Sequence, residues 1–254
     1  MRITFLGTGT STGVPEIGCQ CVVCRSKDRR DKRLRSSLFV EIEKKNLLID
    51  CGPDFRCQMI RNDISHLDGV LITHEHYDHV GGLDDLRPFS HDKNIDIYAE
   101  DNVLKAIEDK MPYVFNRHWN PALPHFSMHS IALLPFEVAG IKVQPIRVMH
   151  GHLPILGYRI NNMAYLTDVK ELPEEEFEKL GGLDVLIVEA LRKIPHPSHE
   201  TIDEALEMIG RIAPKQAFLT HMSHHAGLHA DSGLFLPKHV HFAYDGLSVE
   251  LVTS

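Results

Sequence analysis

The stretch "LITHEHYDHVGG", residues 71–82, places five metal-capable side chains on six consecutive positions. They are His74, Glu75, His76, Asp78 and His79. A core segment would not carry them, because each buried imidazole or carboxylate needs a partner or costs several kcal/mol. Imidazoles and carboxylates without thiolate suit zinc, manganese or iron. So many groups on one loop predict a site for two ions, which needs further ligands from elsewhere in the chain.

Potential ligands also follow several apolar runs that are rich in β-branched residues and predict strands. These strand-terminal residues are Asp50, His74, Asp168, Glu189 and His221. Open α/β sheets place their sites at the carboxyl ends of their strands. We therefore expect these side chains along one edge of a sheet. Asp168 and His221 are candidate further ligands, as is one of His150 and His152, which follow the run 144–149.

Composition predicts an ordinary globular protein. The 254 residues are 43% hydrophobic and 24% charged, enough for a sizeable core. The net charge of −8 argues against tight, sequence-independent binding of nucleic acid. The cationic run 25–35 is interpreted as a solvated loop. No stretch has the length of a membrane helix or the pattern of a secretory signal, so neither is expected.

The pattern of elements predicts one mixed α/β domain over residues 1–254. Apolar runs of strand length alternate with helical patterns, the best of them at 201–214, with others at 101–110 and 173–180. Glycines at 7, 9 and 13 match no nucleotide-binding spacing and predict a tight turn. Three of the five cysteines lie at 19, 21 and 24, which favours metal binding in a reducing compartment, so we expect the cytoplasm. Disulfide or redox chemistry of these thiols is the alternative.

"THEHYDH", residues 73–79, resembles the T-H-x-H-x-D-H signature of the metallo-β-lactamase superfamily. "DCG" at 50–52, "LTD" at 166–168 and "LTHMSH" at 219–224 resemble further elements of that superfamily, in their usual order. The resemblance covers the whole chain and implies an αββα sandwich. It implies that His74, His76 and His150 hold one ion, that Asp78, His79 and His221 hold the other, and that Asp168 bridges the two. His150 is preferred to His152 because the third histidine of that superfamily stands just after its strand.

"GCQCVVC", with His224 far downstream, supplies three thiolates and one imidazole, a closed set for structural zinc. This set is similar to that of the PhnP-like phosphodiesterases, with Cys19, Cys21, Cys24 and His224 as the matching residues, on a zinc-binding loop at about 14–35. Cys51 and Cys57 stand outside this pattern, and we expect them to pack in the core.

The resemblance implies a metal-dependent phosphodiesterase that hydrolyses small cyclic phosphodiesters, phosphoribosyl 1,2-cyclic phosphate or similar, with two Mn or Zn ions and one structural Zn. His199 matches the family's histidine that assists the leaving oxygen. Asp168 and Asp78 are the other predicted catalytic residues. Arg56, Arg87 and Arg159 are open candidates for binding the substrate phosphate. We expect a small phosphodiester as the partner, no membrane and no nucleic acid, and keep a homodimer open.

Two other functions remain open. A ribonuclease Z-like RNA endonuclease would share the histidine-plus-helix element around His199, but the chain has no long glycine-rich or basic insertion to grip tRNA and its net charge is negative. A non-catalytic, zinc-stabilised binding protein like PqqB would have an empty two-metal site. That relative tends to lose superfamily ligands, whereas this chain keeps all seven.

Overall fold

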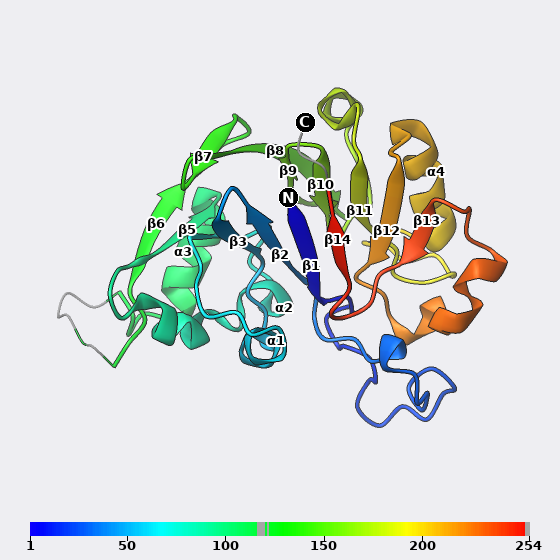
Figure 1. Cartoon of the computed structure of the whole chain (residues 1–254), viewed down its shortest axis with the longest axis horizontal. Coiled ribbons are helices and arrows are strands. Elements are labelled where there is room, and N and C mark those ends of the chain that lie inside the picture. Colours follow the sequence, from blue (N-terminus) through cyan, green and yellow to red (C-terminus); the bar gives the residue numbers. More distant parts are fainter. Residues whose placement is uncertain (116–119, 121, 252–254) are drawn as a thin grey trace.

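Two seven-stranded sheets form the centre of the protein (Figure 1). The computed structural model describes residues 1–115, 120 and 122–251. The first sheet contains, in spatial order, β14 (Ser248–Glu250), β1 (Arg2–Gly7), β2 (Ser37–Ile42), β3 (Lys45–Ile49), β4 (Gly69–Leu71), β5 (Ile95–Ala99) and β6 (Phe126–Ser130). The second contains β13 (Val240–Phe242), β12 (Gln216–Thr220), β11 (Val185–Glu189), β10 (Met163–Leu166), β9 (Leu153–Ile160), β8 (Ile141–His150) and β7 (Phe136–Val138).

Each sheet is antiparallel on one side and parallel on the other. In the first sheet the pairs from β14 to β3 are antiparallel and those from β3 to β6 are parallel. In the second sheet the pairs from β7 to β10 are antiparallel and those from β10 to β13 are parallel. The parallel strands β4, β10 and β11 are buried along their whole length, as continuous apolar runs require.

Helices cover the outer faces of both sheets (Figure 1). The α-helices are α1 (Phe55–Arg61), α2 (Tyr77–Val80), α3 (Asp101–Lys110) and α4 (Ile202–Ile212). The 3-10 helices are η1 (Arg29–Asp31), η2 (Leu83–Ser90), η3 (Glu174–Leu180), η4 (His224–Ala226) and η5 (His229–Leu234). Among the helices in the described ranges, none is long and apolar enough to cross a membrane.

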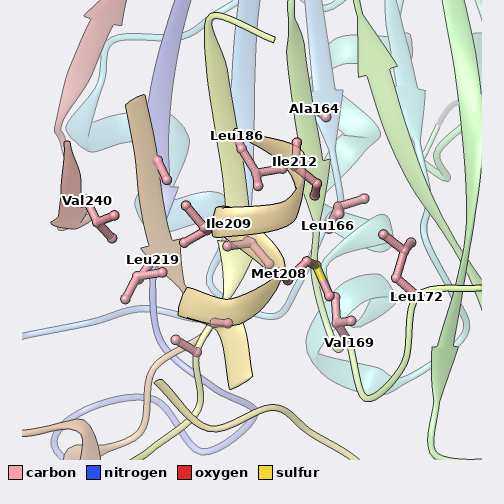
Figure 2. Packing of buried hydrophobic residues seen from close by; sticks show 14 of the residues in the cluster. Ala164, Leu166, Val169, Leu172, Leu186, Met208, Ile209, Ile212, Leu219 and Val240 are labelled. Carbon is pink, nitrogen blue, oxygen red and sulfur yellow. The ribbon is translucent and has the colours of Figure 1, made fainter. Parts of the chain in front are cut away.

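Three clusters of buried side chains hold these layers together. One lies between the sheets and joins residues such as Phe5 and Val40 to Tyr158 and Ile187. A second packs α4 on the outer face of the second sheet, where Met208 and Ile209 lie over β11 and β12 (Figure 2). The third packs α1, α2, η2 and α3 on the first sheet. The layers are thus helix, sheet, sheet and helix in a single domain, so the predicted αββα sandwich is confirmed.

The structure refines two of the expected elements. The pattern at 201–214 forms α4, which starts with a capping box between Thr201 and Glu204. The pattern at 173–180 forms the 3-10 helix η3 (Glu174–Leu180) instead of an α-helix.

The two cysteines outside the zinc-like pattern differ in burial. Cys51 is fully buried, as expected. Cys57 is exposed on α1, so the prediction that it packs in the core is wrong. The buried face of this helix carries Phe55, Gln58 and Met59, which turns the intervening Cys57 toward solvent.

Three of the predicted strand-terminal residues have a left-handed backbone. The φ angles are +64° at Asp50, +54° at Asp168 and +53° at His221. Such a conformation costs about 1–3 kcal/mol for a non-glycine residue and is concentrated at functional sites. The strain therefore falls at the strand ends that carry the predicted ligands.

Candidate metal centre

Four predicted ligands come together in a buried cluster between the two sheets. Asp78 and His79 lie on α2, Asp168 follows β10, and His221 follows β12. One ligand atom from each lies within 4.8 Å of all the others. His79 Nε2 is 3.2 Å from Asp78 Oδ2 and 3.1 Å from Asp168 Oδ2, and His221 Nε2 is 3.4 Å from Asp168 Oδ1. Two imidazole nitrogens and two carboxylates thus face one point.

The carboxylates of this cluster are ionised at neutral pH. Burial opposes the charge on Asp168, but His221 and His79 hold the pKa of its carboxyl well below the usual range. Burial likewise opposes the charge on Asp78, but His79 and His221 outweigh burial and lower the pKa of its carboxyl. Burial would lower the pKa of His79, yet the carboxylates of Asp50, Asp168 and Asp78 raise it well above its ordinary value. The cluster therefore contains two ionised carboxylates that could act as ligands of a cation.

Asp50 supports this cluster from behind. Its Oδ2 is 2.7 Å from His79 Nδ1, on the side of the ring opposite the cluster, and its carboxylate accepts hydrogen bonds from the backbone and hydroxyl of Thr73. A carboxylate that holds the outer nitrogen of a ligating histidine fixes the orientation of the ring. Asp50 was predicted as a strand-terminal polar residue at the site, and the structure places it as the partner of a ligand.

Three more predicted ligands converge beside the first four. The ring centroids of His74 and His76 are 4.6 Å apart, those of His76 and His150 5.3 Å, and those of His74 and His150 5.8 Å. His150 Nδ1 is 2.8 Å from the carbonyl oxygen of Ser198, which leaves Nε2 toward the other rings. His74 is joined to His79, with centroids 4.2 Å apart. The structure thus brings His150 to the histidine group.

One buried nitrogen at this site lacks a partner that a metal would provide. His74 Nε2 is buried and makes no hydrogen bond within the described part of the chain. Leaving such atoms unpaired is costly, and neutral imidazole nitrogens are common metal ligands. The buried His/Asp site is therefore fit for two divalent ions. The assignment of each ligand to one ion stays a prediction.

His199 lies over the site from the loop before α4. The centroid of its ring is 4.6 Å from that of His150 and 5.3 Å from that of His221. Its Nδ1 is 2.6 Å from Oε1 of Glu189, which is fully buried at the end of β11. Burial lowers the pKa of His199 to about 4 and raises that of Glu189 well above its usual value. No spacing in the sequence links these two residues.

Other residues near this loop were assigned no role from the sequence. The ring of His196 is 4.8 Å from that of His199, and Lys170 Nζ is 3.4 Å from the carbonyl oxygen of His199 and 2.9 Å from Glu204 Oε1. Arg159 is one of the arginines proposed for phosphate binding. Its guanidinium donates hydrogen bonds to the carbonyl oxygens of Asn161, Lys179 and Gly181. None of these three residues belongs to the metal cluster. The only local signal for Lys170 was its place two residues after Asp168.

A buried acid beside this loop predicts a pH dependence of stability. Glu200 is 5% exposed, and burial raises its pKa to about 9. The folded protein then binds a proton that the unfolded chain releases above about pH 4.5, so stability falls as the pH rises from there toward 9. Glu200→Gln should flatten this decline in urea unfolding measured at pH 6 and pH 9. Exposed Glu207→Gln is the control, and an unchanged slope in Glu200→Gln would contradict the prediction.

A second cluster joins the loop between β1 and β2 to η4. Cys19, Cys21, Cys24 and His224 have ligand atoms within 4.8 Å of one another. His224 Nδ1 is 3.2 Å from the sulfur of Cys19 and 3.3 Å from that of Cys21. A hydrogen bond from the Cys24 backbone, with His224, lowers the pKa of the Cys21 thiol to about 6. The cluster fits a structural zinc, whose ligands in such sites are thiolates and imidazoles.

Glu16 supports this second cluster as Asp50 supports the first. Its Oε2 is 3.3 Å from His224 Nε2, the nitrogen that points away from the cysteines. Its backbone also forms a hydrogen bond that lowers the pKa of Cys24, although burial, the larger effect, raises that pKa to about 11. One residue thus contacts two of the four predicted zinc ligands.

Comparisons with known proteins agree with this geometry. The family model for the beta-lactamase superfamily domain matches residues 45–222. A solved structure described as a new diphosphatase from the PhnP family has 38% sequence identity, covers 99% of this chain and 98% of its own, and superposes with a TM-score of 0.93. The structure of Zn²⁺-bound PqqB from Methylobacterium extorquens covers 99% and 100% with a TM-score of 0.81, but at 19% identity it shows the fold alone.

Fold and site together define the class: the chain belongs to the metallo-β-lactamase superfamily, and its His/Asp site is fit for divalent ions. Within the superfamily it is a member of the PhnP family.

One sequence relative carries a different name. An octanoyltransferase of Porphyromonas gingivalis is 50% identical over 250 residues, which is 97% of this chain but 51% of that protein. The chain spans about half the length of the curated relatives it matches. The name therefore describes a protein about half of which has no counterpart here, and acyl transfer is not carried over.

Proposed function

We propose that the protein is a binuclear metal-dependent phosphodiesterase that hydrolyses small cyclic phosphodiesters, phosphoribosyl 1,2-cyclic phosphate or similar. The observation that carries the proposal is the position of His199. This histidine is not one of the seven predicted ligands, yet it lies beside a site of carboxylate oxygens and imidazole nitrogens that includes Asp78 and Asp168. Carboxylate and imidazole ligands suit divalent ions such as Mn²⁺ and Zn²⁺. A pair of such ions, when bound, supplies an activated water and neutralises charge on a phosphate group.

The residues of the chain would have separate roles in holding the ions and in transferring the proton. His74, His76 and His150 would hold one ion, Asp78, His79 and His221 the other, and Asp168 would contact both. Asp50 keeps the ring of His79 aligned through the 2.7 Å contact. Because His199 Nδ1 faces Glu189, Nε2 is the nitrogen left to give a proton to the departing oxygen. Glu189 contacts the other ring nitrogen and so fixes the orientation of the imidazole.

His199→Ala tests the role of general acid. The variant should keep both ions of the site yet hydrolyse alkyl phosphodiesters about 10²-fold more slowly, because alkoxides need the proton. Nitrophenyl diesters, whose leaving group departs without a proton, should be affected far less. Steady-state rates on both substrates, with metal content by elemental analysis, give the result. His196→Ala is the matched control, and equal losses on both substrates or loss of metal would remove the assigned role.

The test of the function itself is a substrate screen of purified protein. Cyclic phosphodiesters should be hydrolysed, and linear diesters, tRNA precursors and a lactam serve as the competing substrates. The diphosphatase description of the 38% identical structure makes a phosphoanhydride the second candidate substrate. Robust cleavage of tRNA or of the lactam with no diester turnover would overturn the proposal.

Metal analysis separates the enzyme from a binding protein. We expect three metal ions per chain, two at the His/Asp site and one at the cysteine cluster. One zinc alone, with no hydrolysis of any substrate, would instead support a non-catalytic protein like PqqB. Three expectations stay predictions: a small substrate, a cytoplasmic location and no binding of nucleic acid. A homodimer stays open.

A further inference from the structure

A small hollow lies on the outer face of the second sheet, where β8 begins and β9 ends. It has a volume of about 300 Å³. Its lining comes from β8, β9, the turn after β9 and η3, and consists of Lys142, Gln144, Arg159, Asn161 and Lys179. A volume of this size is at the lower end of the range for small-molecule sites. Because every lining side chain is cationic or carries an amide, the hollow suits a small polar ligand.

The pairing of β8 with β9 places three of these side chains on one face. Gln144 is paired with Arg159 in the antiparallel register, and the adjacent Val143 and Ile160 belong to the core between the sheets. Because side chains alternate across a strand, Gln144 and Arg159 point to the outer face, together with Lys142. The amide and the guanidinium therefore stand side by side on two paired strands.

Arg159 is held by carbonyl oxygens, and no carboxylate neutralises its charge. Its Nε donates to the carbonyl oxygen of Asn161 over 2.9 Å, and Nη1 donates to those of Lys179 and Gly181. Within residues 1–115, 120 and 122–251, Nη2 makes no hydrogen bond and Arg159 has no ion pair. A group that is already fixed in place loses little entropy on binding. The planar fork of a guanidinium also matches the oxygens of a phosphate group.

Lys142 adds a second uncompensated charge to the hollow. It is exposed on β8 and forms no ion pair within the described part of the chain, although Glu137 of β7 is its partner in the register. Lys179 contributes less charge, because its Nζ is 2.8 Å from both carboxylate oxygens of Glu176. The hollow thus gathers positive charge on a chain whose net charge is −8. Such a local field attracts small anions.

The hollow is separate from the predicted site of chemistry. Gln144 lies near the start of β8, and the predicted metal ligand His150 is the last residue of this strand. A strand rises about 3.3 Å per residue, so these two residues are about 20 Å apart along β8. None of the seven predicted metal ligands lines the hollow. A small molecule in the hollow would therefore not occupy the metal centre.

We propose that this hollow binds the phosphate group of a small phosphorylated molecule, at a distance from the metal centre. The guanidinium of Arg159 and the ammonium group of Lys142 would form charge-assisted hydrogen bonds with the phosphate oxygens. The amides of Gln144 and Asn161 can donate and accept hydrogen bonds, so they would contact hydroxyl groups on the rest of the molecule. The inference is independent of the proposed phosphodiesterase function.

Calorimetric titration of the metal-loaded protein with glucose 6-phosphate tests this site. Because the probe can also bind at the metal centre, variants must separate the two sites. Lys142→Gln should weaken binding at the hollow about 10-fold, since a hydrogen bond to a charged group is worth about one tenfold step in affinity or more. Asp168→Asn, which changes the metal centre, should retain binding at the hollow. Lys105→Gln removes an exposed lysine on α3 and is the matched control.

Arg159→Gln should weaken binding as Lys142→Gln does. This variant also loses hydrogen bonds to the end of η3, so circular dichroism must show that it folds. If it does not fold, the exposed Lys142→Gln decides alone. Equal Kd values and equal numbers of sites in the parent and in Lys142→Gln would overturn the proposal. The loss of all binding in Asp168→Asn would overturn it as well.

Two further probes identify the group that the hollow recognises. Glucose should not bind, because it lacks the phosphate. Inorganic phosphate should bind less tightly than glucose 6-phosphate, because it offers no hydroxyl groups to Gln144 and Asn161. Equal Kd values for the two phosphates would assign the hollow to free phosphate and overturn the role of the amides. Equal binding of glucose and glucose 6-phosphate would overturn phosphate recognition.

Discussion

Asp168→Ala should abolish phosphodiester hydrolysis while the protein stays folded. The carboxylate of Asp168 approaches both His79 and His221, at 3.1 Å and 3.4 Å. By the proposed bridging role, its removal would take one ligand from each of the two ions. Metal charge at a reacting phosphate is worth several kcal/mol, and each 1.4 kcal/mol is about a factor of ten in rate. We therefore expect a loss of more than about 10³-fold in kcat/KM, with fewer than two ions left at the site.

The matched control for this variant is Asp168→Asn. The backbone at Asp168 is left-handed, which asparagine tolerates better than alanine. Asp168→Asn should thus melt closer to the parent than Asp168→Ala does, yet lose activity to the same degree because it lacks the charge. Circular dichroism, elemental analysis and steady-state rates measure the three quantities. A fully metallated and active Asp168→Asn would exclude the bridging role.

Cys21→Ser should release one zinc and lower the melting temperature by about 10 °C or more. Structural zinc contributes its binding free energy to folding, and 1 kcal/mol shifts the melting temperature of a protein of this size by about 2–4 °C. The effect should be largest on the long loop between β1 and β2, which in the structure has only the short helix η1. Calorimetry and zinc analysis give the result.

A graded companion to this variant is Glu16→Gln. It keeps the backbone hydrogen bond to Cys24 but removes the carboxylate that faces His224 Nε2. Changes to such outer partners typically cost about 10–100-fold in metal affinity, so zinc should transfer to a chelator faster at unchanged stoichiometry. Unchanged stability and zinc content in Cys21→Ser would show that the cluster is not a zinc site, whatever Glu16→Gln does.

The mixed α/β class and the main cluster were predictable because their signals are local or repeated, whereas the αββα sandwich was implied by the resemblance to the superfamily. The segment 73–79 holds several ligands in a row, and the parallel strands end at one edge of each sheet, so the sequence alone places Asp168 and His221 at the site. The partners of the ligands could not be predicted in this way. Asp50 had the signature of a strand-terminal residue, but its contact with His79 depends on how α2 returns against β3.

Contacts between loops that are distant along the chain could not be predicted from the sequence. Glu189 meets His199 only because the loop before α4 folds back over the end of β11. Glu16 meets His224 although the two lie far apart along the chain. Cys57 was misplaced because one turn of a short helix decides its exposure, and the apolar character of cysteine gave no hint of the direction.

The segment His221–Met222–Ser223–His224 carries a ligand of the buried cluster at one end and a ligand of the cysteine cluster at the other. Its middle is tied to the glycine turn, since the backbone of Thr10 donates to the carbonyl oxygen of Met222. We therefore expect that removing metal from one cluster also affects the other. A strong chelator used to empty the active site would also draw zinc from the other end of this short segment. With zinc at the cysteine cluster, as proposed, we expect that full reconstitution requires zinc first and the ions of the His/Asp site afterwards.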